Sequence, residues 1–199
     1  MPETDYAEIL IQLQAADLAL RNQLIEQGRL GDGYDHAMEQ LHLKNADKLS
    51  SIMDDIGYPT ADKVGISASK AAWLVIQHAI SRPDFMRRCR DALQDEIKLD
   101  NGDPIQLAYL TDRIAVFEGR PQLYGTQFDW DEHGQMSPQS CDDIAAVDRR
   151  RAKLGLNTLA EQTRAMRERV KAEGQFAPVG DTRKKSYEEW RVRVGWGAD

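Results

Sequence analysis

The sequence predicts a mainly α, single-domain helical bundle of about six or seven helices, with a small β-hairpin or irregular loop near residues 120–141. Apolar residues recur at spacings of three and four along most of the chain, which is the pattern of amphipathic helices. Glycine and proline stand at the ends of these runs, where helices stop and start. A chain of 199 residues with 41% hydrophobic content buries one substantial core, so a second globular domain is not required.

The first two helices are expected at residues 4–27 and 34–56. Apolar residues recur at helical spacing through the first segment, and Gly28 marks its end. The second segment has the same periodicity and reaches Gly57, which accepts the left-handed conformation that closes many helices. Pro59 follows at a point where a helix cannot continue.

Three helices are expected in the middle of the chain. Residues 68–80, with Ser67 as the cap, are apolar on nearly every side, which predicts a central and buried helix. The next helix covers residues 83–97 and begins with Pro83, a residue favoured in the first turn. Residues 104–118 form the third, and we expect this helix to pack beside the 68–80 helix.

The segment 120–141 alternates polar and apolar residues, as a hairpin or an extended loop does. Helices are expected to resume at 143–153 and 159–173. Beyond them the apolar content falls, but Trp190 and Trp196 indicate that part of the tail docks. The chain is therefore divided into a helical domain at residues 1–165 and a basic C-terminal helix end and tail at residues 166–199.

Charge is distributed unevenly within the net charge of −7. Residues 1–147 carry 13 Lys and Arg against 25 Asp and Glu, whereas residues 148–199 carry 13 against 8. A basic tail can dock on the acidic body or bind an acidic protein partner, and it can equally be a solvated helix. Nucleic acid is not expected as a partner, because phosphate binding requires clustered positive charge and the body is acidic.

The sequence gives two indications of compartment. No apolar run approaches the roughly 18 to 20 residues that span a bilayer, and the start M-P-E-T-D-Y is acidic where a secretory signal is basic. Cys89 and Cys141 are the two cysteines, and they stand far apart, which suits a reducing compartment. We expect a cytoplasmic protein with no membrane association.

Several motifs together resemble a mostly bacterial family that is classed as a domain of unknown function. They are G-Y-P-T at 57–60, W-L-V-I-Q-H-A at 73–79, Y-L-T-D-R at 109–113, G-R-P-Q-L-Y-G-T-Q at 119–127 and V-D-R-R-R-A-K-L-G-L at 147–156. Asp17, Arg21 and Asn45 also match positions of this pattern. The resemblance spans roughly residues 10–165 and implies no reaction. Tyr58 and Ile80 depart from it, because the family has tryptophan and an acidic residue there.

His78 is the candidate for acid–base work, since the pKa of free histidine lies near 6.5. If the 104–118 helix lies beside it, Asp112 can orient its ring as the carboxylate of an Asp–His couple does. The alternative is a buried histidine whose ring is satisfied by Asp112 or Tyr109, because buried polar groups need partners.

A set of polar residues around this pair is expected to hold a ligand. Arg113 and Arg120 can clamp a carboxylate or phosphate through their planar donors. The alternative is a structural network in which Asp112 holds Tyr124 and Arg113 binds a loop carbonyl. The ligand-binding candidates are Gln77, Tyr109, Arg113, Arg120, Gln122, Tyr124 and Gln127.

No metal or cofactor is expected. His36, His42, His78 and His133 include no pair at ligand spacing on one helix, and no phosphate-binding glycine loop is present in the sequence.

Our first hypothesis is an enzyme, a hydrolase or transferase, that acts on a small polar or peptide-like substrate through a pocket of His78, Asp112 and Arg113. A noncatalytic ligand- or protein-binding module is the alternative, and in it the same cluster is structural.

Overall fold

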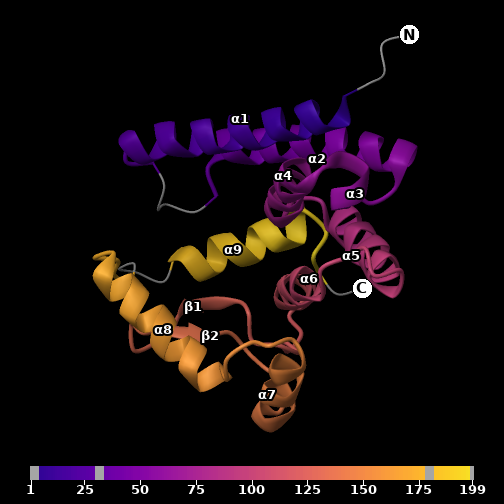
Figure 1. Cartoon of the computed structure of the whole chain (residues 1–199). Coiled ribbons are helices and arrows are strands. Elements are labelled where there is room, and N and C mark those ends of the chain that lie inside the picture. Colours follow the sequence, from indigo (N-terminus) through magenta and orange to yellow (C-terminus); the bar gives the residue numbers. More distant parts are fainter. Residues whose placement is uncertain (1–4, 30–33, 178–181, 198–199) are drawn as a thin grey trace. The chain divides into compact units, whose positions relative to one another are not determined.

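The computed structural model describes residues 5–29, 34–177 and 182–197 (Figure 1). In these ranges it is mainly α-helical with one two-stranded antiparallel hairpin, which confirms the expected fold class. The helices are α1 (Tyr6–Glu26), α2 (His36–Ile56), α3 (Ala61–Val64), α4 (Ile66–His78), α5 (Pro83–Lys98), α6 (Pro104–Phe117), α7 (Ile144–Lys153), α8 (Leu159–Ala172) and α9 (Thr182–Arg193). The strands are β1 (Phe128–Trp130) and β2 (Met136–Pro138).

The chain divides into two compact units. Unit 1 contains the described residues of Met1–Asp103 and Thr182–Gly195, and unit 2 contains those of Pro104–Asp181 and Trp196–Asp199. Helix α4 belongs to unit 1 and α6 to unit 2, so the expected packing of the two helices beside each other stays a prediction. The expected boundary after residue 165 is not one of these divisions and stays a prediction.

Helix α4 is central to unit 1, as its sequence predicts. It packs against α1 and α2, which also contact each other. Ala68, Ala71 and Ala72 are buried along α4, and their small side chains allow the backbones to approach closely. Leu10 of α1 and Leu49 of α2 are fully buried and fill the space between the three helices.

The start of α4 differs from the expected one. Ser67 was expected as the cap, but the helix begins at Ile66 and its cap is Gly65. Gly65 has φ of +83°, a conformation that L side chains rarely adopt, and it closes α3 before it opens α4. The start of α5 is as expected, with Pro83 in its first turn.

Helix α9 was expected only as a solvated charged helix, because its sequence has no apolar stripe. It is held in unit 1 by polar contacts instead. The Trp190 indole nitrogen donates to Glu39 Oε1 at 3.3 Å and to Ser81 Oγ at 3.2 Å. Arg193 Nη2 lies 3.0 and 3.1 Å from the two Glu39 oxygens. Trp190 therefore docks the tail as predicted, and the tail's positive charge contributes through Arg193.

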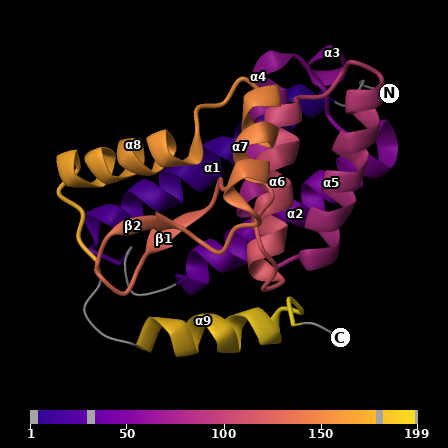
Figure 2. The same ribbon diagram turned by 90° about the horizontal axis from the view of Figure 1, so that it is seen from below.

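In unit 2 the hairpin lies against α8 (Figure 2). Its register pairs Phe128 with Pro138 and Trp130 with Met136, which confirms a hairpin in the 120–141 segment. Arg167 of α8 donates to the backbone oxygen of Met136 at 3.0 Å. Trp196, fully buried, stacks on Phe117 within the same unit, with ring centroids 5.0 Å apart.

Candidate functional site

Unit 1 contains a cluster of one carboxylate and two imidazoles, which we call the Asp17 cluster: Asp17 from α1, His42 from α2 and His78 from the last turn of α4. His78 Nδ1 lies 2.8 Å from Asp17 Oδ2, and His42 Nε2 lies 2.9 Å from the same oxygen. The Asp17 side chain is fully buried, His42 is 8% exposed and His78 is 28% exposed. His78 is thus the member of the cluster that reaches solvent.

The helical repeat explains why these polar residues converge. Asp17 stands seven residues from Leu10 and from Leu24, so it lies on the buried face of α1. His42 precedes Leu49 by the same interval on α2. His78 follows Val75 by three residues on the core-facing side of α4. Each side chain therefore occupies a core position, and α1, α2 and α4 bring them together.

The Asp17 carboxyl is ionised. Burial by itself raises its pKa, but the close polar contacts and the charge of His42 and His78 outweigh burial and hold the pKa of Asp17 well below its usual range. A buried carboxylate that stays charged needs a compensating cation or a protonated partner. The two imidazoles are the groups placed to supply that compensation.

Two atoms of the cluster are buried without a hydrogen bond in the described part of the chain, Asp17 Oδ1 and His42 Nε2. For His42 Nε2 the distance and the angle disagree. It lies within ion-pair distance of Asp17 Oδ2, at 2.9 Å, but the direction of the contact does not suit an N–H donor. The angle carries more weight, because the strength of a hydrogen bond falls steeply as its angle departs from linear. The contact between His42 Nε2 and Asp17 Oδ2 is therefore a close approach of two polar atoms and not a hydrogen bond.

An outer layer of side chains fixes His42. The Tyr34 hydroxyl lies 2.6 Å from His42 Nδ1, and the two rings stack with centroids 5.7 Å apart. Burial raises the pKa of Tyr34, and the charges of Glu39 and Asp17 raise it further, so the side chain remains a phenol. Trp190 meets Tyr34 edge-on at 6.0 Å.

Glu39 is a second buried carboxylate of unit 1. Ser81 Oγ donates to Glu39 Oε1 at 2.7 Å, and Trp190 and Arg193 of α9 bind the same carboxylate. Burial by itself raises the pKa of Glu39, but these bonds and the Arg193 charge lower it overall. Ser81 also bonds Tyr34, so hydrogen bonds connect Glu39 with His42 through two hydroxyls.

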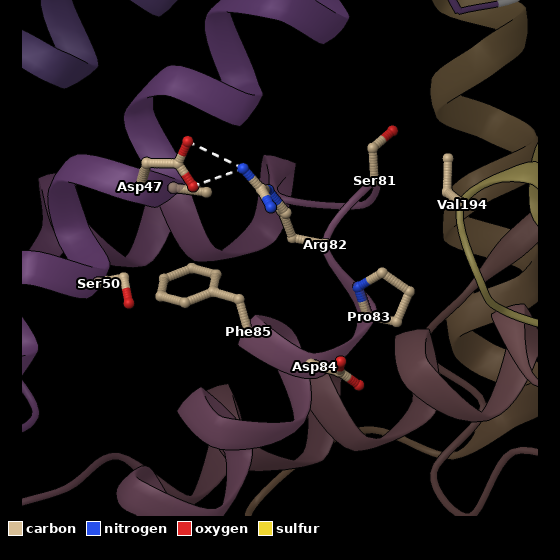
Figure 3. A pocket seen from close by; sticks show the side chains of 9 residues that line it. Asp47, Ser50, Ser81, Arg82, Pro83, Asp84, Phe85 and Val194 are labelled. Carbon is tan, nitrogen blue, oxygen red and sulfur yellow. Dashed lines mark hydrogen bonds and ion pairs between the residues drawn. The ribbon is translucent and has the colours of Figure 1, made fainter.

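A pocket of about 320 Å³ lies elsewhere in unit 1 (Figure 3). Asp47, Ser81, Arg82, Pro83 and Phe85 are among the residues that line it. Arg82 Nη2 binds both oxygens of Asp47, at 2.6 and 2.8 Å. No member of the Asp17 cluster lines this pocket, and Ser81 is the residue that links it to the Glu39 network.

Asp112, the expected partner of His78, binds a loop of its own unit. Its carboxylate accepts hydrogen bonds from the backbone N–H of Leu123 at 2.8 Å, Tyr124 at 3.1 Å and Thr126 at 3.0 Å, and from the Thr126 hydroxyl at 3.1 Å. Burial raises its pKa, and these bonds offset the rise only in part. The carboxylate that orients His78 is Asp17, so the expected role of Asp112 is corrected: it holds the Leu123–Thr126 turn. This is the alternative in which Asp112 holds Tyr124, through its backbone.

The other predicted residues of unit 2 are tied into the same loop. Arg113 Nε donates to Gln127 Oε1 at 3.1 Å, and burial lowers the pKa of Arg113 to about 10. Gln122 is fully buried, with its amide nitrogen donating to the backbone oxygens of Gln127 and Gln139. Arg120 pairs with Glu118 on the surface. Their expected role in holding a ligand stays a prediction.

The remaining two predicted residues fall in different units. Gln77 is half-buried on α4 of unit 1, next to His78 in the sequence, and Tyr109 is half-buried on α6 of unit 2. Tyr124 offers its backbone oxygen to the buried Arg151 guanidinium at 2.8 Å. Of the predicted site residues, Gln77 and His78 therefore belong to unit 1 and the others to unit 2.

The sequence indicates Asp17 only through the family pattern, and it gives no role to His42. A signal was present, because Asp17 interrupts an otherwise apolar helix face between Leu10 and Leu24. His42 was set aside because it stands six residues from His36. That spacing rule finds ligands on one helix, and it does not detect ligands supplied by three helices.

A family model described as a family of unknown function, DUF6624, matches residues 4–172. The match covers most of the chain, and the chain therefore belongs to this family. This confirms the expected membership of a family of unknown function, while the individual motifs and the bacterial origin stay predictions. Comparisons with curated proteins and with solved structures gave no match. Among the described residues, none of the helices has the length and apolar character needed to cross a membrane.

Proposed function

We propose that this member of the DUF6624 family is an enzyme that acts on a small polar or peptide-like substrate, with the Asp17 cluster as its reaction centre. The observation that carries the proposal is the pairing of a fully buried Asp17 with a partly exposed His78 at 2.8 Å. Asp17 orients the imidazole from inside the protein, and His78 faces solvent on its other side. A substrate can therefore reach the ring that the buried carboxylate holds.

The chemistry that fits this arrangement is proton transfer. In a hydrolase or transferase, an oriented imidazole takes a proton from water or from a hydroxyl group and later returns it to the leaving group. Asp17 stabilises the positive charge that forms on the ring, because its own pKa is held low by the two histidines. His42 is buried, with Nε2 beside the same Asp17 oxygen and Nδ1 2.6 Å from the Tyr34 hydroxyl.

The test is a substrate screen with matched histidine variants. Small esters, amides and phosphoesters are offered to the wild-type chain, to His78→Gln and to His133→Gln, whose side chain is 76% exposed in unit 2. We expect turnover by the wild type and the control, and a loss of about 10²- to 10⁴-fold in His78→Gln. The proposal fails if a folded His78→Gln protein retains full turnover, or if no substrate class is converted.

The alternative function is a noncatalytic binding module, and one observation favours it. The pocket of unit 1 is lined by Ser81, Arg82 and Asp47 and not by His78. Arg82 is a planar donor that can exchange Asp47 for the carboxylate of a small-molecule or peptide ligand. Saturable binding of a carboxylate ligand that Arg82→Ala removes, without turnover, would favour this alternative. A protein partner for the basic tail at residues 166–199 is a separate proposal. Removing the contacts of Arg193 alone does not test it.

A further inference from the structure

We propose that Asp17, His42 and His78 together bind one divalent transition-metal ion of the zinc class. Each side chain offers one ligand atom, and the three atoms lie within 4.8 Å of one another. Two imidazole nitrogens and a carboxylate oxygen are the donor set of many catalytic zinc and non-haem iron sites. The metal site rests on the proposed function, because both use the Asp17 cluster. Metal binding itself can be measured without any substrate turnover.

The two unsatisfied buried atoms support this site. His42 Nε2 and Asp17 Oδ1 are buried without a hydrogen bond among the described residues, although such atoms rarely lack a partner. A cation between the rings and the carboxylate supplies what both atoms lack, because a metal binds lone pairs and needs no N–H direction. The short Nε2 to Oδ2 distance of 2.9 Å is then a contact between two ligands of one ion.

The Tyr34 hydroxyl is placed to accept a hydrogen bond from His42 Nδ1, and the tautomer with the proton on Nδ1 is the one that a metal requires. When His42 Nδ1 carries the ring proton and donates it to the Tyr34 oxygen, 2.6 Å away, the lone pair of Nε2 faces the Asp17 carboxylate. A lone pair against a buried carboxylate is unfavourable unless a cation lies between them. Metal-bound histidines commonly have such an outer partner on the second nitrogen, and here Ser81 and Glu39 continue the chain behind Tyr34.

Charge and access agree with a cation. The Asp17 carboxyl is fully buried, and in the state with both imidazoles neutral its negative charge has no compensating partner. A divalent ion bound to the carboxylate supplies the missing positive charge. Because His78 is 28% exposed, one of the three ligands is in contact with solvent, from which an ion can enter.

Binding requires a small adjustment. A tetrahedral ion with bonds of about 2.0–2.1 Å holds its ligands about 3.3–3.4 Å apart. The present separations from Asp17 Oδ2 are 2.8 Å to His78 and 2.9 Å to His42, so each ring moves outward by about half an ångström. His78 Nδ1 must also give up the proton that it shares with Asp17, which makes metal affinity rise with pH.

The first experiment measures zinc binding to the full chain. The protein is stripped with a chelator, dialysed and titrated with ZnCl₂ by calorimetry, alongside Asp17→Asn, His42→Gln, His78→Gln and the control His36→Gln. His36 is exposed on the same helix as His42. We expect one Zn²⁺ per chain for the wild type and the control, and a loss of affinity of at least about 10- to 100-fold in the three cluster variants, the amount that outer-shell changes alone cause.

A second experiment uses Co²⁺, whose visible absorption reports its ligands without any activity. We expect a cobalt spectrum of nitrogen and oxygen ligation in the wild type, unchanged in His36→Gln and lost in His42→Gln. Tyr34→Phe keeps the ligands but removes the partner of His42 Nδ1, so it should weaken binding by about 10- to 100-fold. The wild type and Tyr34→Phe retain all three ligands. Their comparison therefore still tests the metal site if a ligand variant fails to fold.

The metal site is overturned if the chelated wild type binds no Zn²⁺, or if Asp17→Asn and His42→Gln bind it as the wild type does. The outcomes separate this proposal from the proposed function. Stoichiometric zinc without turnover of any substrate supports the metal site and contradicts the enzyme. Turnover that depends on His78 in a chain that binds no zinc supports the enzyme and contradicts the metal site.

Discussion

Two buried aspartates, one in each unit, have opposite surroundings. Asp17 meets two imidazole rings, and their close polar contacts and charge lower its pKa in spite of burial. Asp112 meets three backbone N–H groups and a hydroxyl of one turn, and burial raises its pKa in spite of those bonds. Asp17 contacts imidazoles, which can exchange protons or bind metal, whereas Asp112 contacts the main chain. Burial of a charged residue is therefore not enough to identify a site, and the identity of its partners decides.

A large effect is expected from removing the charge of Asp112. In Asp112→Asn one acceptor oxygen becomes a donor that faces backbone N–H groups, and the turn from Leu123 to Thr126 loses its acceptor. We expect a loss of about 2–3 kcal/mol in the free energy of unfolding. Urea denaturation followed by circular dichroism measures it. A loss below about 0.5 kcal/mol would show that the turn does not depend on this carboxylate.

Gly125 lies in the same turn and allows a sharper comparison. Its φ is +62°, and a Cβ there would lie 2.5 Å from Leu159 Cδ1. Gly155 has φ of +68° with no atom near its Cβ position, so it is the matched control. Both alanine variants bear the strain of the left-handed conformation, about 1–2 kcal/mol, and Gly125→Ala should lose about 1–3 kcal/mol more through overpacking. Equal losses of stability in thermal denaturation of the two variants would mean that the Leu159 side chain moves aside without destabilising the protein.

The two aspartates should also respond to pH in opposite directions. The folded pKa of Asp17 is lowered, so its charge stabilises the protein above the ordinary aspartate pKa of about 3.9, and this stability is lost as the pH falls toward the folded value. The folded pKa of Asp112 is raised, so its contribution is present below about 3.9 and is lost as the pH rises through the folded value.

Urea midpoints measured between about pH 6 and 3 check these signs. The stability difference between the wild type and Asp17→Asn should shrink as the pH falls. The difference between the wild type and Asp112→Asn should grow over the same range. Parallel trends in the two variants would contradict the contrast between the sites.

The smallest effect is expected at the docking of α9. Arg193, 60% exposed on its side chain, pairs with the buried Glu39, so Arg193→Ala should cost about 0.2–1 kcal/mol. Lys185→Ala is the control, because Lys185 and Glu189 form an exposed pair at 3.8 Å within the helix. We expect no measurable change there. If both variants behave alike in urea denaturation, Arg193 does not anchor α9.

The helices were largely predictable from the sequence, because apolar periodicity and glycine or proline boundaries are local signals. The central place of α4 follows from its apolar composition alone. Helix α9 could not be found this way, since its contacts are made by Trp190 and Arg193 with Glu39, a residue about 150 positions away. Such long-range polar contacts leave no periodic pattern in the sequence.

The candidate site was predictable only in part. His78 could be singled out because a histidine in an apolar helix needs a partner. The identity of that partner depends on which helices are neighbours, which local spacing does not encode, and so Asp112 was chosen where the structure has Asp17. The polar residues near Asp112 bond to one another and to the loop that follows α6, and their expected role in holding a ligand stays a prediction.

The most direct test of the contrast between the two aspartates is proton NMR of the His78 ring. A ring N–H that is bonded to a buried carboxylate gives a resolved downfield signal, here from His78 Nδ1 on Asp17 Oδ2 at 2.8 Å. The measurement compares the wild type with Asp17→Asn and Asp112→Asn in metal-free protein. The signal should disappear or shift strongly in Asp17→Asn and stay in place in Asp112→Asn. Loss of the signal in Asp112→Asn, with Asp17→Asn unchanged, would contradict the assignment of His78 to Asp17.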